Sequence, residues 1–461
     1  MKKLQPAIAP HKSLPPEMLV EIFLHYAADI AEQVINEEPM YRCLSQFPWV
    51  LGHICSKWRQ IALGEPRIWG TIGLHAVEQG DRPMLNEAFR RGVKSPLWLS
   101  ASEDEHEESV HDDFLRDVVC SQSKRLTELS LFVFWEAFEE FLTLPQDTFP
   151  VLEAVQLAVL DCIGVNGANL CMSGSDLSVF RGAACLRRID IGTPRLEVTP
   201  LCFPMNLGLC WPQVTHINFL RISIKVSIAH ELMNLCTSLH ECCLSLIPVL
   251  LDVAFRPASI RLSHLRNLVV QEDGPNRAIF SDFILPLVLP ALEDFQFSLW
   301  QRSLADLAPL AGLVGVIDGW STSRVLALRA EMNYWGKHLA EVAGHLSFLT
   351  SIDALHSILP ASGIQMMAQE QYLPRLLSLR ASVAFANMDD FIDMLKTRWA
   401  RTIVRQGSQL QSGTSACMIR SGTIFVLGAD DEFISRLSNK IREVQEEIGV
   451  SGIHIDLRAC R

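Results

Sequence analysis

The sequence predicts an α/β fold in which short parallel strands alternate with helices along an irregular solenoid. A pattern of three apolar residues, with two residues between the first and second and one between the second and third, recurs along most of the chain. Segments between several copies, such as 226–235, have the periodicity of amphipathic helices. One strand and one helix cannot bury their apolar edge alone, so such units stack into a continuous core. We expect the strands on the concave face and the helices on the convex face.

Seven copies of the pattern are clear and three are weaker. The first positions of the clear copies are 25 to 34 residues apart, at the upper end of the lengths of leucine-rich repeats. The second and third apolar positions of a copy face the same side of a strand. The clear copies are Leu126/Leu129/Leu131, Leu152/Val155/Leu157, Leu186/Ile189/Ile191, Val214/Ile217/Phe219, Leu239/Cys242/Leu244, Leu265/Leu268/Val270 and Leu292/Phe295/Phe297, and the weaker ones are Leu326/Leu328, Leu349/Ile352/Ala354 and Leu376/Leu379/Ala381.

The C-terminal part continues the alternation of helix and strand. The apolar spacing predicts a helix at 389–401, a strand at 423–427, a second helix at 432–448 and a last strand at 453–457. We expect this ending to cap the array, because a terminal unit must present a more polar outer face. The segment 406–416 is rich in Gln, Ser and Gly and is expected to be a mobile loop.

The N-terminal stretch, residues 13–72, has a different pattern. Its first apolar residues recur with a helical period, and Pro15 and Pro16 fit a helix only in its first turn. A second amphipathic helix is expected between Pro48 and Gly64. Two short helices bury too little area for a strongly stable isolated domain. We therefore expect this stretch to pack against another surface.

Several short motifs stand at fixed places in this stretch. They are Leu-Pro-Pro-Glu-Met-Leu at 14–19, Ile-Phe at 22–23, Ile-Cys at 54–55, Trp-Arg at 58–59, Ile-Ala at 61–62, and Pro-Arg at 66–67 followed by Trp69. Together they resemble an F-box, and more narrowly the F-box of the large mushroom-type fungal families. The segment 29–47 departs from that pattern, because it is longer than the usual connection. The repeats that follow are similar to the degenerate leucine-rich repeats that follow an F-box in those fungal proteins.

The chain is accordingly expected to have four parts. These are an N-terminal tail at 1–12, an F-box-like helical domain at 13–72 with its insertion, a connecting helical segment at 73–125, and a leucine-rich-repeat-like solenoid with a C-terminal cap at 126–461. The connecting segment contains an acidic run at 103–108. We interpret the run as a solvated loop, with a metal site or a basic partner as the alternatives.

Composition excludes several classes of protein. Hydrophobic residues make up 49% and charged residues 20% of the chain, which is typical of a folded protein and not of a disordered one. A formal net charge of −12 disfavours nucleic acid and anionic membranes as partners. The most apolar region, 283–316, is interrupted by prolines and charges and does not read as a membrane span. Thirteen cysteines without regular spacing and the lack of a secretory signal predict a cytoplasmic or nuclear protein.

No motif for catalysis is visible. The sequence lacks the glycine-rich phosphate loops, the Gly-x-Ser-x-Gly elbow and any Cys-x-x-Cys pair. The cysteines, including Cys55, are interpreted as packing residues, and His230, His240 and His264 as structural ones. Hence we expect no catalytic residue, no metal and no cofactor. Five tryptophans of the array fit either the core or a recognition surface: Trp135, Trp211, Trp300, Trp320 and Trp335.

The resemblance to F-box proteins implies a function. The chain would be a substrate-recognition subunit of an SCF-type cullin-RING ubiquitin ligase, binding a Skp-type adaptor, and through it a cullin, with the F-box and an unknown target protein with the solenoid. The alternative is a non-degradative protein-binding scaffold in which the F-box is vestigial. An enzyme is a third hypothesis, motivated only by the numbers of cysteines and histidines.

The motif also implies which residues bind the adaptor. By position, eight residues belong to the adaptor interface or to the small core beneath it: Leu14, Pro15, Leu19, Ile22, Phe23, Ile54, Trp58 and Trp69. For Trp58 and Trp69 the sequence leaves both roles open, a place in the core and a direct contact with the adaptor.

Overall fold

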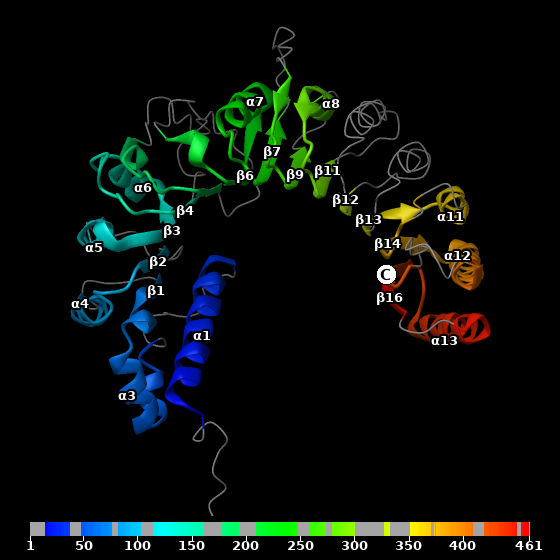
Figure 1. Ribbon diagram of the computed structural model, residues 1–461, viewed down its shortest axis with the longest axis horizontal. Helices are drawn as coiled ribbons and strands as arrows, with labels where there is room; N and C mark the ends of the chain where they lie inside the picture. Colours follow the sequence, from blue (N-terminus) through cyan, green and yellow to red (C-terminus); the bar gives the residue numbers. More distant parts are fainter. Residues whose placement is uncertain are drawn as a thin grey trace, which may run out of the picture. The chain divides into compact units, whose positions relative to one another are not determined.

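A computed structural model of the chain divides into two compact units, Met1–Val214 and Thr215–Arg461. Elements are numbered as in Figure 1. The structure describes residues 14–36, 48–75, 82–102, 114–160, 178–192, 209–247, 259–272, 279–299, 327–331, 351–369, 373, 375–408, 419–449 and 453–460.

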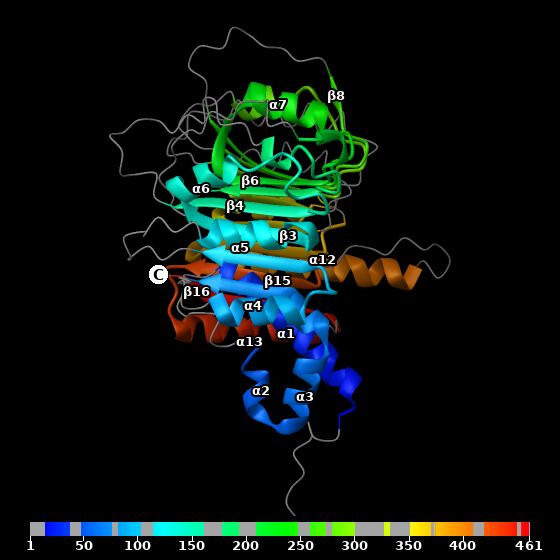
Figure 2. The ribbon, with the colours of Figure 1, turned by 90° about the vertical axis from the view of Figure 1, so that its left-hand side faces the viewer.

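A parallel sheet with the strand order β1-β2-β3-β4-β5 forms the centre of the first unit. Helices α4, α5 and α6 connect successive strands and lie on one face of this sheet (Figures 1 and 2). The strands are β1 (Thr71–His75), β2 (Leu97–Ser102), β3 (Leu126–Phe134), β4 (Ala154–Leu160) and β5 (Arg188–Gly192). The helices and 3-10 turns are α4 (Arg82–Arg91), α5 (Phe114–Gln122), η5 (Ser123–Arg125), α6 (Trp135–Leu142), η6 (Ser178–Phe180) and η7 (Trp211–Gln213).

The N-terminal stretch consists of helices α1 (Pro16–Asn36), α2 (Leu51–Ile54) and α3 (Ser56–Gly64) and the 3-10 turn η3 (Pro66–Gly70). Helix α1 contacts β1, β2 and α3, so the stretch packs on the sheet of the first unit. The expected single helix after Pro48 is wrong, because the backbone is extended at Cys55 (φ −160°, ψ 168°). The Cys55 Sγ accepts the Trp58 N–H at 3.5 Å and caps α3, which separates the two helices.

The sheet begins at Thr71, earlier than the sequence predicted. Residues 73–125 were expected to be a connecting helical segment, but they also contain part of β1 and all of β2. Leu99 of β2 pairs with Ile72 on one side and Leu129 on the other, so both strands continue the sheet. The acidic run, the tail at 1–12 and residues 37–47 of the insertion lie outside the described residues.

The second unit has a parallel sheet with the strand order β6-β7-β9-β11-β12-β13-β14-β15-β16, and β8 and β10 pair separately. The strands are β6 (His216–Lys225), β7 (Glu241–Ile247), β8 (Ile260–Arg261), β9 (Asn267–Glu272), β10 (Leu287–Val288), β11 (Asp294–Leu299), β12 (Ala327–Glu331), β13 (Ser351–Leu359), β14 (Ser378–Ala384), β15 (Ser421–Leu427) and β16 (His454–Cys460). The helices and the 3-10 turn are α7 (Val226–Leu235), α8 (Ile279–Ile284), α11 (Ala361–Met367), η8 (Phe385–Asn387), α12 (Met388–Ser408) and α13 (Asp431–Ile448).

The recurring apolar pattern supplies the cores of both sheets. In the first unit Leu129, Val155 and Ile189 are register partners on adjacent strands. In the second unit Cys242 pairs in the same way with Ile217. All five side chains are buried, as the alternation along a strand requires. The prediction of an α/β fold with parallel strands at these copies is confirmed.

The C-terminal predictions are confirmed in kind. Residues 389–401 lie in α12, 423–427 in β15, 432–448 in α13, and most of 453–457 in β16. The expected loop at 406–416 is corrected at its start, because α12 continues to Ser408, and the rest of that loop lies outside the described residues. None of the helices in the described parts of the chain has the length and apolar composition that a bilayer crossing needs.

Candidate functional site on the N-terminal helices

Helix α1 is apolar on two sides. Leu19 and Phe23 are buried in the core of the first unit. Met18, Ile22 and Tyr26 follow each other at intervals of four residues, and their side chains remain 46–52% exposed. A spacing of four places side chains one above the other on a helix, so these three form a single exposed row. We call this row the α1 stripe.

Two further exposed apolar side chains lie on the next helices. Ile54 ends α2 and Leu63 lies in the last turn of α3, and both are more than two-fifths exposed. Isolated exposed apolar residues are common on protein surfaces, whereas several within one small helical stretch are typical of a binding surface. The N-terminal stretch therefore presents apolar groups from all three of its helices.

The buried side of α1 is fixed by specific contacts with α3. The rings of Phe23 and Trp58 meet edge to face with centroids 4.7 Å apart. Lys57 Nζ donates a 2.7 Å hydrogen bond to the carbonyl oxygen of Leu14, which holds the start of α1. These contacts orient α1 so that its stripe stays on the surface.

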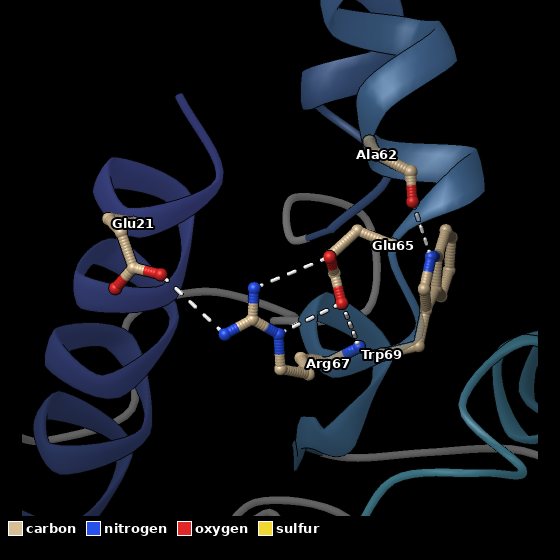
Figure 3. A network of polar contacts seen from close by, with 5 residues as sticks. All are labelled: Glu21, Ala62, Glu65, Arg67 and Trp69. Atoms are coloured by element: carbon tan, nitrogen blue, oxygen red, sulfur yellow. Dashed lines mark hydrogen bonds and ion pairs between the residues drawn. The ribbon is translucent and has the colours of Figure 1, made fainter. Parts of the chain in front are cut away.

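Trp69 is a core residue of the first unit. Its side chain is 1% exposed, and its indole Nε1 donates a 2.7 Å hydrogen bond to the carbonyl oxygen of Ala62 (Figure 3). The Trp49 ring meets it edge to face at 4.7 Å, and the Arg91 guanidinium lies 5.3 Å from its centroid. The backbone of Gly92 lies so close to that of Trp69 that a Cβ added at Gly92 would lie 2.5 Å from the Trp69 carbonyl oxygen. The Trp69 ring therefore belongs to the core and leaves almost no surface exposed.

An ion-pair network joins η3 to α1. Glu65 accepts hydrogen bonds from the backbone N–H of Arg67 at 3.2 Å and from its Nε at 3.0 Å, and Arg67 Nη1 lies 3.6 Å from Glu21 (Figure 3). The side-chain hydrogen bond from Arg67 lowers the pKa of the Glu65 carboxyl below its usual range, although partial burial opposes this. Exposed ion pairs contribute little to stability. Their effect here is to fix the turn that leads from α3 into β1.

The eight residues assigned from the motif differ in how far they are buried. Pro15, Ile22 and Ile54 are exposed, Leu14 and Trp58 are half-buried, and Leu19, Phe23 and Trp69 are buried.

Three exposed residues of this surface were not assigned from the sequence: Met18, Tyr26 and Leu63. Apolar residues on both sides of α1 merge into one broad helical stripe in the sequence, so its periodicity does not tell the exposed row from the buried one. The buried residues Leu19, Phe23 and Ala27 also follow each other at intervals of four, so the sequence offers no signal that separates the two rows.

Elsewhere, Cys236 and Cys242 are packed into the core, whereas Cys185 and Cys210 are exposed. Burial raises the pKa of the Cys236 thiol to about 12 and that of Cys242 well above its usual value, so neither is a ready nucleophile. Trp211 is buried too, whereas Trp300, Trp320 and Trp335 lie outside the described residues. Within the described ranges, no group of three or more His, Cys, Asp or Glu side chains is arranged to hold a metal ion.

The chain matches no protein-family model and no curated protein sequence.

Proposed function

We propose that the chain is a substrate-recognition subunit of an SCF-type cullin-RING ubiquitin ligase, and that its N-terminal helices are an F-box that binds a Skp-type adaptor. The α1 stripe carries the proposal. It lies on the same helix as the Leu-Pro-Pro-Glu-Met-Leu motif, and it leaves three large apolar side chains about half exposed. Contiguous exposed apolar side chains of this kind are typical of a surface that a partner covers.

The energetics favour a surface larger than the stripe. Full burial of an apolar side chain of this size contributes roughly 1.5–3 kcal/mol. Met18, Ile22 and Tyr26 are already half buried, so docking gains about 1 kcal/mol from each. A specific interface buries roughly 800 Å² on each partner, which exceeds what three half-exposed side chains supply. The proposed interface therefore includes Ile54 and Leu63.

The packing of α1 supports the proposal, because the stripe is presented on a rigid element. Leu19 and Phe23 fill the core beneath it, and the hydrogen bond from Lys57 holds the start of the helix. A preorganised helix loses little conformational entropy when it docks. Little of the free energy gained by burying the apolar side chains is therefore lost to ordering the helix.

The parallel sheets are proposed to form an irregular leucine-rich-repeat array that holds an unknown target protein. The in-register stacking of the apolar pattern supports this. The array would raise the effective concentration of a target lysine near the ubiquitin-charged enzyme that the cullin brings. We propose no covalent step for the chain itself, and a location in the cytoplasm or nucleus, where such a ligase would meet its targets.

Co-purification of the full-length chain with a Skp-type adaptor and a cullin tests the proposal. The test variant is Met18→Ser with Ile22→Ser, and the matched control is Val93→Ser, an exposed valine of the same unit. We expect the test variant to lose the adaptor and cullin while its thermal melting stays that of the wild type. Adaptor binding that is equal in the test and control variants would sink the proposal.

A protein-binding scaffold with a vestigial F-box is the second candidate. The observation in its favour is that α1 and η3 contact β1 and β2, the first strands of the sheet. These helices could thus serve only to cover the edge of the first unit, as terminal units of repeat proteins require. A wild-type chain that retains neither adaptor nor cullin under the same conditions would favour the scaffold.

A further inference from the structure

Strand β16 lies at one edge of the sheet of the second unit (Figure 1). It pairs in parallel with β15 on one side, and no strand among the described residues pairs with its other side. The His454 N–H donates to the carbonyl oxygen of Arg420, so His454 directs its backbone groups toward β15. Because these groups alternate along a strand, those of Ile455, Leu457 and Ala459 point to the outer side. They are placed to pair with a further strand.

The core-facing row of β16 is covered less completely than that of its neighbour. Ile424 and Val426 of β15 are 0% exposed, whereas Leu457, the register partner of Ile424, is 8% exposed. Ile455 is half-buried and Ala459 is exposed. Helix α13 contacts β16, but it does not bury the whole row. A further strand beside β16 would cover more of these side chains.

The opposite row of β16 carries one acid and one base. Asp456 and Arg458 are two residues apart and share a face, and Arg458 Nε donates a 2.8 Å hydrogen bond to the Asp456 carboxylate. The Arg458 guanidinium also lies 5.9 Å from the Phe425 ring centroid on β15. Charges on an edge strand commonly prevent pairing with other chains. Two opposite charges do so only where a neighbouring strand brings like charges against them.

One antiparallel register of two β16 strands satisfies both the backbone and the charges. With Leu457 opposite Leu457 of a second copy, Ile455 of each copy lies opposite Ala459 of the other, and these outward-directed residues form the hydrogen-bonded pairs. Asp456 of each copy then lies opposite Arg458 of the other, at positions where side chains approach most closely. The adjacent registers with the same backbone pairing bring Asp456 against Asp456, or Arg458 against Arg458, which repel.

We propose that β16 is a homodimerisation edge, at which two copies of the chain join their second-unit sheets through antiparallel β16 strands centred on Leu457. The register is self-complementary, as a two-fold interface requires. An added strand gains affinity from backbone hydrogen bonds. Strand β16 has seven residues, and a single strand edge buries less than the roughly 800 Å² per partner of a stable complex. The dimer is therefore expected to dissociate on dilution.

Analytical ultracentrifugation of the full-length chain at a series of concentrations tests the proposal. Asp456→Arg places like charges opposite each other twice in the dimer, and the exchange Asp456→Arg with Arg458→Asp restores opposite charges in the same register. The matched control is Glu231→Arg, the same charge change at an exposed position of α7. We expect the wild type, the control and the exchange to dimerise within about threefold of one another, and Asp456→Arg at least about tenfold more weakly.

A second variant acts on the backbone instead of the charges. Ala459→Pro removes an outward N–H but none of the hydrogen bonds to β15, and proline is tolerated on edge strands for this reason. We expect it to weaken dimerisation by about tenfold while its thermal melting stays that of the wild type.

Three outcomes would overturn the proposal. A wild type that stays monomeric at every concentration would rule out a second copy as the occupant and leave a strand of another protein. Dimerisation of Asp456→Arg that is as tight as that of the control would place the interface elsewhere. An exchange variant that melts normally but does not dimerise would exclude this register. Adaptor co-purification is expected to persist in all these variants, so failure here is distinguishable from failure of the proposed function.

Discussion

The indole Nε1 of Trp69 donates a 2.7 Å hydrogen bond to the carbonyl oxygen of Ala62, and this contact ties the last helix of the N-terminal stretch to the turn that opens the first sheet. Trp69 also stands at the first position of an apolar pattern that continues at Ile72 and Leu74 of β1. The tryptophan is thus shared between the helices and the sheet. The two parts are expected to unfold together.

Trp69→Phe is expected to destabilise the first unit by about 2 kcal/mol, because it leaves the Ala62 carbonyl oxygen unsatisfied and a void beside Trp49. Urea unfolding followed by circular dichroism measures this. Trp58→Phe, at a half-buried ring, is the milder comparison. A Trp69→Phe chain of normal stability that had lost the adaptor would show that Trp69 is a contact residue after all.

The two faces of α1 are expected to separate stability from binding. Leu19→Ala removes a fully buried side chain and is expected to cost about 3 kcal/mol of unfolding free energy. Ile22→Ala, three residues later on the exposed stripe, is expected to cost less than about 0.5 kcal/mol. Denaturant titration of both variants checks this. Similar losses in the two would contradict the assignment of the faces.

Gly92 and Gly64 provide a matched pair. A Cβ at Gly92 would lie 2.5 Å from the Trp69 carbonyl oxygen, so Gly92→Ala forces the backbone apart and is expected to destabilise by about 2 kcal/mol. Gly64 has nothing within 4 Å of the same position, and Gly64→Ala is expected to be neutral or slightly stabilising. Melting temperatures of the two variants measure the difference, and equal values would refute it.

His230 is expected to add a pH dependence to stability. Burial lowers its pKa, its Nε2 donates to the carbonyl oxygen of Phe283 at 2.8 Å, and its Nδ1 has no hydrogen-bond partner among the described residues. The hydrogen bond to Phe283 and the nearby Asp282 oppose the shift. Since the pKa in the folded chain lies below the ordinary 6.5, the unfolded chain takes up this proton more readily. The stabilising contribution is therefore present above about pH 6.5 and is lost as the pH falls below it.

Urea unfolding at a series of pH values checks this against His230→Gln, which removes the ionisable group. We expect the unfolding free energy of the wild type to fall more steeply than that of the variant between about pH 6.5 and pH 5. Parallel curves for the two proteins would show that His230 does not titrate in this range.

The sequence was most informative where one physical requirement decides the structure. The apolar residues of α7 recur with a single helical period, and the helix occupies the predicted residues Val226–Leu235. The strands were predicted from the recurring apolar pattern, because a strand with one buried face needs apolar residues at alternate positions. Leu129 and Val155, for example, are separated by one repeat in the sequence and are direct neighbours in the sheet.

The sequence was less informative where two requirements overlap. Trp69, Ile72 and Leu74 follow the repeat pattern, but they lie within a stretch already explained as helices, so β1 was overlooked. The break at Cys55 depends on one residue with extended backbone, which an apolar period does not reveal. The exposed row of α1 has the same apolar composition as the buried row. Only the burial of Leu19 in the core of the first unit shows which row is which.

Calorimetric titration of the full-length chain with a purified Skp-type adaptor tests the central claim most directly. We expect the wild type and a Val93→Asp control to bind with the same affinity. Ile22→Asp is expected to bind about a hundredfold more weakly, because docking would bury an unpaired carboxylate at the middle of the α1 stripe. An Ile22→Asp chain that binds the adaptor as tightly as the control, or a wild type that does not bind it, would contradict the claim.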